Sequence, residues 1–345
     1  MFRKLLFTII CLLLFINAAN SQSLKVLHSD GNLSFRGLSV VDDNIVWVSG
    51  SKGTVGKSID GGKTWKWMTV KGYEKCDFRD IEAFSKDVAI IMAVAEPAYI
   101  LKTTNGGKSW KKVYENKTKG MFLDAMDFKD EKNGIVIGDP IDGTFYIAKT
   151  YDGGENWLQV YRGGGTADSA EACFASSGTN IRLLKDRFLF VSGGLSSNLI
   201  FNKRGNDTFA DVFGDPKSLI NKYKLPIIQG TTSTGANSIA IKDSLNFIVV
   251  GGDFTNDSAM PNCAITTDGG NTWSQPEKSP QGYKSCVEYL YGDTWICCGL
   301  TGVDISNDNG KTWSQISKDS YHACRKAKNG KVVYLSGNKS RIGVL

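Results

Sequence analysis

One short pattern occurs five times along the chain and restricts the fold more than any other feature of the sequence. The pattern is [S/T]-x-[D/N]-x-G-x-[S/T/N]-W, and successive copies are offset by 45, 47, 116 and 40 residues. Repetition at such periods is typical of architectures that place many copies of one small structural unit side by side. The five copies, called the boxes below, have their third and last positions at Asp60 and Trp65, Asn105 and Trp110, Asp152 and Trp157, Asp268 and Trp273, and Asp308 and Trp313.

Each box has the chemistry of a hairpin turn between two strands. The Asp or Asn side chain accepts hydrogen bonds from backbone N–H groups, and the glycine adopts a positive φ angle that other residues avoid. The tryptophan begins the outgoing strand, where we expect it to be mostly buried between neighbouring sheets. Every residue of the box therefore has a structural role, and no catalytic role is needed to explain it.

The apolar segments between the boxes predict an all-β fold, a seven-bladed β-propeller with four strands in each blade. The step of 116 residues is long enough for two blades, and the one without a box is expected over residues 170–213, with a degenerate hairpin over residues 199–207. A short helical insertion is expected over residues 215–226. After Tyr321 only three strands fit before the last residue, so residues 24–28 are expected to supply the fourth strand of the last blade and to close the ring.

The boxes resemble the Asp-box, or bacterial neuraminidase repeat, which lies between the third and fourth strands of a propeller blade. The chain is most similar to the extracytoplasmic propellers related to the photosystem II assembly/stability factor, and residues 35–40 and 46–54 carry this similarity. The resemblance implies a seven-bladed, non-catalytic scaffold that helps to assemble or stabilise other proteins. Asp-boxes also occur in sialidases, other glycosidases and sortilin-like receptors, on the face opposite the binding site. They therefore imply the fold and leave the chemistry open.

The first residues have the features of a secretory signal peptide. Two basic residues precede an apolar run over residues 5–16, and Ala19 and Ser21 are small residues typical of a cleavage site. We therefore predict a signal peptide over residues 1–21 and one propeller domain over residues 22–345. The protein is expected to be exported to the periplasm or the extracellular space, without membrane insertion after cleavage. An uncleaved anchor is the alternative.

The charge and the histidine content argue against several functions. The chain has 41 basic and 35 acidic residues without a basic block, so nucleic-acid binding is not expected. Two histidines without metal-binding spacing, and the absence of a C-x-x-C motif or a phosphate loop, predict no metal and no cofactor. Seven cysteines follow the signal peptide and are expected to be buried free thiols. Cys286 and Cys324 occupy equivalent repeat positions and are the one pair to test for a disulfide. We expect a monomer.

The candidate functional residues lie where the inner strands of the blades are expected to begin, at one mouth of the central channel. Seven inner strands, and the loops between second and third strands, bring their side chains together there. We predict a binding or assembly site for a protein partner or a glycan, without turnover. The ligand-binding candidates are Arg36, Arg79, Glu171 and His322.

A second interpretation is a secreted glycoside hydrolase, sialidase-like or of another kind, which needs two carboxylates about 5–10 Å apart. Arg36 resembles the first arginine of a sialidase only superficially, because the residues after it do not continue that motif. A third interpretation is that Arg36 and Arg79 pair with Asp80 or Glu82 and merely stiffen the inner strands. The carboxylates available for hydrolysis at the expected mouth are Glu96, Asp139, Asp142 and Asp253.

Overall fold

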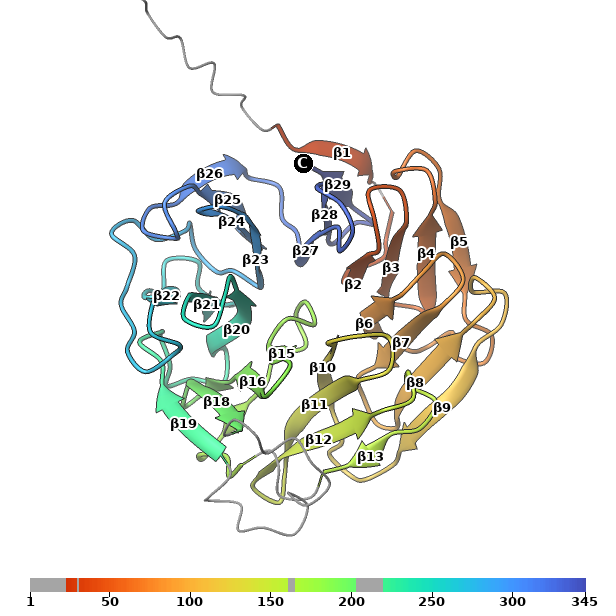
Figure 1. Ribbon diagram of the computed structural model, residues 1–345, viewed down its shortest axis with the longest axis horizontal. Coiled ribbons are helices and arrows are strands. Elements are labelled where there is room, and N and C mark those ends of the chain that lie inside the picture. The colour runs from red at the N-terminus through yellow and green to blue at the C-terminus, as the bar shows by residue number, and fades with distance from the viewer. Residues whose placement is uncertain (1–22, 30, 161–164, 203–219) are drawn as a thin grey trace, which may run out of the picture.

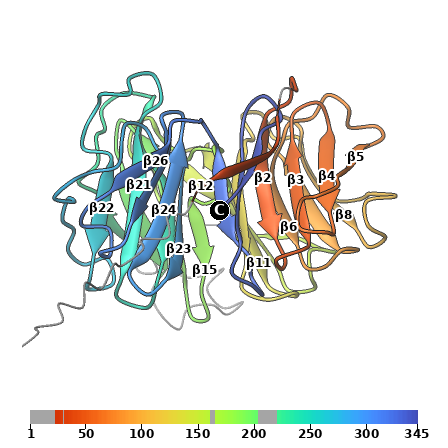
Figure 2. The same ribbon diagram turned by 90° about the horizontal axis from the view of Figure 1, so that it is seen from above.

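The computed structural model describes residues 23–345 except residue 30, residues 161–164 and residues 203–219. Seven antiparallel sheets form a ring around a central channel (Figure 1). Seen from the side, the ring is a disc whose strands run between its two faces (Figure 2). The chain is therefore the all-β, seven-bladed propeller that the repeats predict. The predicted signal peptide over residues 1–21 lies outside the described residues.

No helix in the described part of the chain is long and apolar enough to cross a membrane.

Blades 1, 2, 3 and 6 each consist of four consecutive strands that pair in chain order, with the first strand innermost. Blade 1 contains β2 (Phe35–Val40), β3 (Val46–Gly50), β4 (Thr54–Ser58) and β5 (Lys66–Thr69). Blade 2 contains β6 (Phe78–Ala83), β7 (Ala89–Ala93), β8 (Ala98–Thr103) and β9 (Lys111–Asn116). Blade 3 contains β10 (Leu123–Phe128), β11 (Gly134–Ile141), β12 (Thr144–Thr150) and β13 (Leu158–Gln159). Blade 6 contains β23 (Cys286–Tyr291), β24 (Thr294–Gly299), β25 (Gly302–Ser306) and β26 (Ser314–Ser317).

Blade 7 joins the two ends of the described chain. It contains β27 (Ala323–Lys326), β28 (Val333–Ser336), β29 (Ile342–Val344) and, as the outer strand, β1 (Lys25–His28). β1 pairs antiparallel with β29, with Lys25 opposite Val344. This pairing confirms the predicted closure of the ring by an N-terminal strand.

Blades 4 and 5 are less regular than the others. Blade 4 contains β15 (Ile181–Leu183), β16 (Phe188–Val191), β18 (Asn198–Asn202) and β19 (Ile220–Lys224). Blade 5 contains β20 (Thr234–Ile241), β21 (Phe247–Asp253) and β22 (Cys263–Thr266), and the short β14 (Glu171–Ala172) and β17 (Gly193–Gly194) extend its sheet beyond β20.

Two predictions for blade 4 were wrong. Its inner strand begins at Ile181 and not near residue 170, because the chain first crosses the channel. The helix expected over residues 215–226 is replaced at residues 220–224 by the outer strand β19, which pairs with β18 along its length. The first part of that range, and the expected degenerate hairpin from residue 203 onward, lie outside the described residues.

The hydrophobic core lies between the blades. Every residue of β3 and of β7 is buried, because neighbouring blades cover both faces of these strands. One apolar cluster, for example, packs Trp47 of blade 1 against Ile81 and Leu101 of blade 2. The burial expected for the five box tryptophans is confirmed for Trp157 and Trp313, whereas Trp65, Trp110 and Trp273 are half-buried.

Each box forms the turn that follows the third strand of its blade. In the first box, Thr64 donates through its N–H and its Oγ1 to the Asp60 carboxylate at 2.9 and 2.6 Å, and Gly62 N donates to Ser58 Oγ at 2.9 Å. The bonds from Thr64 lower the pKa of Asp60 to about 2. The backbone bonds recur in the other four boxes. The first and third side chains of each box are thus used within their own turns, as the structural interpretation requires.

Candidate functional site at the channel mouth

The beginnings of the inner strands surround a cavity of about 410 Å³ at one mouth of the channel. β2 and β6 supply Arg36 and Arg79, β11 supplies Asp139, and the segment before β27 supplies His322. Four of the eight residues predicted for the mouth therefore meet there. The remaining lining residues are Phe122, Ala172, Cys173, Phe174, Ala175, Ser176, Asn237, Phe254, Tyr283 and Leu300.

Two arginines carry the positive charge of the mouth. Arg36 Nη1 donates to the Ser176 carbonyl at 3.3 Å, and burial, followed by the Arg79 charge, lowers the pKa of Arg36. Arg79 Nε pairs with Asp77 at 2.7 Å, and its guanidinium lies 5.8 Å from the Phe122 ring centroid. The alternative interpretation, in which these arginines pair with Asp80 or Glu82, was wrong. Asp80 accepts bonds from backbone N–H groups, and Glu82 pairs with a lysine of blade 7.

The two other predicted residues at the mouth are His322 and Asp139, and of these only Asp139 carries a charge at pH 7. His322 Nε2 lies 2.9 Å from Asn338 Oδ1 and 3.2 Å from Ser34 Oγ. Burial, together with the Arg36 charge, lowers the pKa of His322 to about 3, so the imidazole is neutral at pH 7. Asp139 Oδ1 accepts a bond from Cys173 N at 2.9 Å, and burial raises the pKa of Asp139 to about 6. At pH 7 the cavity therefore has two cationic side chains and one carboxylate that is mostly ionised.

Aromatic and apolar side chains border one side of the cavity. Phe254 packs edge-on against Phe174 and Tyr283, with ring centroids 6.0 and 6.3 Å away. Phe254 is 43% exposed and Leu300 is 38% exposed, although both line the cavity. An exposed apolar border beside guanidinium groups suits a ligand that has an acidic group next to an apolar one.

Residues 173–180, called the plug below, fill the channel beneath the mouth. Ser176 Oγ donates to Asn237 Oδ1 at 2.7 Å and Ser177 Oγ donates to the Ser285 carbonyl at 2.7 Å. Arg325 Nη2 of blade 7 donates to the Ser177 carbonyl at 2.9 Å. The plug thus binds blades 5, 6 and 7 to one another, and the mouth is a closed bowl. The sequence prediction missed the plug, whose only signal is a run of small polar residues with no box.

The backbone of the plug requires a glycine at its narrowest point. Gly178 has a φ angle of 67°, and a Cβ atom there would lie 2.3 Å from Asp80 Cγ. Asp80 is itself buried, with Oδ2 accepting from Met126 N at 2.7 Å. The plug therefore fits between the inner strands of blades 2 and 3 only because residue 178 has no side chain.

Three of the four carboxylates proposed for hydrolysis do not line the mouth cavity. Glu96 is exposed and accepts a bond from Gly120 N at 2.9 Å. Asp142 borders a different cavity at the edge of blade 3. Asp253 accepts bonds from Thr255 N and Oγ1 at 2.9 and 2.7 Å and so closes its own turn. Among the described lining residues, Asp139 alone offers a carboxylate, whereas glycosidases use a pair.

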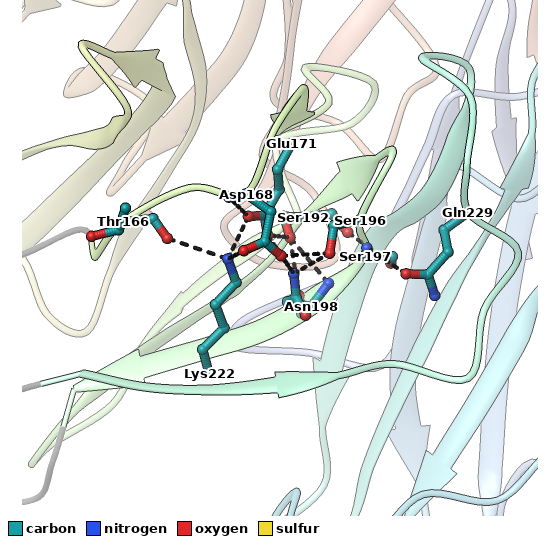
Figure 3. Close-up of polar contacts among 9 residues, drawn as sticks. All are labelled: Thr166, Asp168, Glu171, Ser192, Ser196, Ser197, Asn198, Lys222 and Gln229. Carbon is teal, nitrogen blue, oxygen red and sulfur yellow. Dashed lines mark hydrogen bonds and ion pairs between the residues drawn. The ribbon is translucent and has the colours of Figure 1, made fainter. Parts of the chain in front are cut away.

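The predicted position of Glu171 at the mouth was also wrong. It lies on β14, beside β17, and its side chain is fully buried. Figure 3 shows it among polar side chains, of which Asn198 and Lys222 belong to strands of blade 4. Lys222 Nζ contacts its carboxylate at 2.6 Å, Asn198 Nδ2 donates to it at 2.7 Å, and Ser192 Oγ also donates to it. Lys222 Nζ also pairs with Asp168 at 2.8 Å. Glu171 therefore holds β14 against blade 4.

The cysteines behave as the sequence predicts. All seven after the predicted signal peptide are free thiols, six of them buried and Cys76 half-buried. Cys286 and Cys324 are close together without a disulfide: Cys324 N donates to Cys286 Sγ at 3.4 Å.

The ring of seven blades, closed by an N-terminal strand and filled by the plug, defines the chain as a seven-bladed β-propeller with a bowl-shaped mouth. Residues 16–120 match the family described as Photosynthesis system II assembly factor YCF48. This match lies within the first 120 residues and agrees with the resemblance stated from the sequence, and the solved structures below share the propeller fold. No curated protein matches the sequence.

Three solved structures illustrate the likeness of the fold. "YCF48 bound to D1 peptide" is 15% identical, with a TM-score of 0.65 over 93% of this chain and 96% of that chain. YCF48 from Cyanidioschyzon merolae is 15% identical, with a TM-score of 0.62 over 94% and 98%. The WD40 domain of Neurospora crassa Pan2 is 12% identical, with a TM-score of 0.58 over 94% and 95%. At these identities the likeness concerns the fold.

Proposed function

We propose that the protein is an exported, non-catalytic binding and assembly factor that captures a segment of a protein partner at the channel mouth. The observation that carries this proposal is the bowl itself, in which Arg36 and Arg79 lie beside an exposed apolar border above a closed channel. A similar propeller, YCF48, has been solved bound to a D1 peptide, which supports a peptide as the kind of ligand.

The chemistry of the mouth selects an acidic segment with a neighbouring apolar side chain. Arg79 pairs with Asp77, whereas Arg36 has no ion-pair partner among the described residues, and a guanidinium binds a carboxylate in a bidentate manner. Phe254 and Leu300 leave apolar surface exposed at the border, which an apolar residue of the partner would cover. A volume of about 410 Å³ holds a short segment and not a folded domain.

The beginning of the sequence supports export. A basic start, a short apolar run over residues 5–16 and small residues at 19 and 21 are the features by which secretory signals are recognised. In this proposal the partner is also exported, or has a segment on that side of the membrane.

The proposal is tested by capture and by a hydrolysis screen with the same preparation. The mature protein, residues 22–345, is immobilised and exposed to the exported proteins of the source cells, beside Arg79→Gln and the box-face control Lys63→Gln, which changes an exposed residue of the first box. We expect one protein or peptide to be captured by the wild type and by Lys63→Gln, and not by Arg79→Gln.

Two results would contradict the proposal. One is capture that survives Arg79→Gln and is lost with Lys63→Gln, which would place the binding surface on the other face. The other is hydrolysis of any glycoside in a broad screen, abolished by Asp139→Asn, which would favour the glycoside hydrolase interpretation.

A further inference from the structure

Three cysteine side chains from two blades meet in the interior beside the plug. The sulfur atoms of Cys286, Cys298 and Cys324 all lie within 4.8 Å of one another, and all three residues are fully buried. Cys286 and Cys298 face each other across β23 and β24, and Cys324 comes from β27 of the next blade. Sequence spacing paired Cys286 with Cys324 but did not indicate Cys298, because the three residues are spread over 39 positions without a metal-binding motif.

Hydrogen-bond donors surround the sulfur of Cys286. Cys286 Sγ accepts bonds from Arg325 Nη1 at 3.3 Å and Cys324 N at 3.4 Å, and Thr179 Oγ1 of the plug lies 3.7 Å away. The half-buried Arg325 thus has the Cys286 sulfur as one of its hydrogen-bond acceptors.

We propose that Cys286, Cys298 and Cys324 form a three-coordinate binding site for a soft monovalent cation, Cu(I). An equilateral triangle with the upper-limit side of 4.8 Å places its centre about 2.8 Å from each sulfur. Metal–thiolate bonds of about 2.3 Å thus require each sulfur to move inward by at most about 0.5 Å. Side-chain rotations of this size need no change of the strand pairing.

The ligand set favours Cu(I) over Zn(II). Structural zinc sites take four nitrogen, sulfur or oxygen ligands, and among the described residues no fourth Cys, His, Asp or Glu completes the group. Soft thiolates without hard ligands select Cu(I). One Cu(I) with three thiolates has a net charge of −2, and Arg325 compensates one of these charges. Binding releases the remaining thiol protons to solvent and changes no oxidation state.

The proposed site connects blade 6 to blade 7 and is separate from the mouth at which the partner is proposed to bind. Cys324 lies on the inner strand of the blade that the N-terminal strand completes. A bound ion is expected to stabilise the closed ring, because it binds the folded protein and not the unfolded chain.

The test is an anaerobic titration of the mature protein with Cu(I). A phosphine keeps the thiols reduced, and a chromogenic chelator competes with the protein for Cu(I) and reports the affinity. We expect one Cu(I) per chain, a thiolate-to-copper absorption in the near ultraviolet and a higher unfolding temperature. Cys324→Ser is expected to weaken binding at least about 100-fold. Cys263→Ser is the matched control, because Cys263 is equally buried but lies outside the cluster, and it is expected to bind as the wild type does.

The proposal is wrong if the wild type binds Cu(I) no more tightly than Cys324→Ser, or if Cys263→Ser loses binding to the same extent. It is also wrong if one Zn(II) binds to the same cysteines more tightly than Cu(I). Circular dichroism verifies that each variant is folded. If Cys324→Ser is too unstable to titrate, Cys298→Ala provides the same comparison, with the same expected loss.

Discussion

Lys284 and Asp304 form a fully buried ion pair next to Tyr283 of the mouth, and replacing Lys284 by methionine is expected to destabilise the propeller strongly. Lys284 Nζ lies 2.6 Å from Asp304 Oδ2, with side chains 0% and 2% exposed, so water does not screen the pair. The ammonium also donates to Thr301 Oγ1 and to the Gly302 carbonyl, both at 3.1 Å.

Lys284→Met leaves the Asp304 charge buried, with a backbone N–H at 3.2 Å as its remaining hydrogen-bond donor. Breaking such a pair on one side costs about 3–5 kcal/mol, whereas replacing both partners by apolar residues of similar size is often neutral. We therefore expect Lys284→Met to lower the free energy of unfolding by about 3–5 kcal/mol and the double variant Lys284→Met/Asp304→Leu to recover most of that loss.

Urea unfolding at pH 7, followed by tryptophan fluorescence and circular dichroism, measures both variants. A loss below about 1 kcal/mol for Lys284→Met would show that the pair is screened by solvent. A double variant as unstable as the single one would show that packing, and not the unpaired charge, causes the loss. Either result refutes the reasoning.

Three further outcomes follow from the burial and the backbone of individual residues. Trp313 is 1% exposed, so Trp313→Ala is expected to lower the free energy of unfolding by about 3–5 kcal/mol, and Trp65→Ala, at a half-buried site, is expected to lower it clearly less. Urea unfolding measures both variants, and equal losses would contradict this expectation. Gly178→Ala is expected to lower the free energy of unfolding by about 1–3 kcal/mol, because the φ angle of residue 178 is positive and the added Cβ atom would clash with Asp80. An unchanged melting temperature would show that the plug adjusts to the added atom. Burial raises the pKa of Asp139 to about 6, so the folded protein binds this proton more tightly than the unfolded chain. The free energy of unfolding is therefore expected to fall as the pH rises from about 4 to about 6, and Asp139→Asn, compared with the wild type in urea at each pH, is expected to lose that part of the slope.

The architecture was predictable because its signals are local. Each box fixes one turn through residues that lie within eight positions of one another, and the spacing of the boxes then sets the number of blades. The closing role of residues 24–28 followed from counting strands, and the pairing of β1 with β29 confirms it. Arg36 and Arg79 reached the mouth because they occupy the same position at the start of two neighbouring inner strands.

The plug and the acidic residues were not predictable from local signals. The side-chain hydrogen bonds that join Ser176, Ser177 and Thr179 to other blades span 59 to 148 residues, so no short sequence pattern indicates them. These residues lie in the channel and not in the sheet of blade 4. The prediction that Glu171 begins the inner strand of that blade was therefore wrong by ten residues, because the strand begins at Ile181. Asp142 lies in a turn with a positive φ angle of 50° and borders a different cavity. Asp253 misses the mouth because its carboxylate bonds to its own loop.

The central claim, that the mouth binds an acidic segment through Arg36 and Arg79, is tested most directly by fluorescence anisotropy with the captured peptide. The wild type is compared with Arg36→Glu/Arg79→Glu and with Lys63→Glu on the box face, each verified as folded by circular dichroism. We predict that the double reversal weakens binding at least about tenfold, that Lys63→Glu leaves the affinity unchanged, and that replacing the acidic group of the peptide by an amide has the same effect as the double reversal. Undiminished binding to the double reversal, with a loss in Lys63→Glu, would contradict the claim and place the binding surface on the opposite face of the disc.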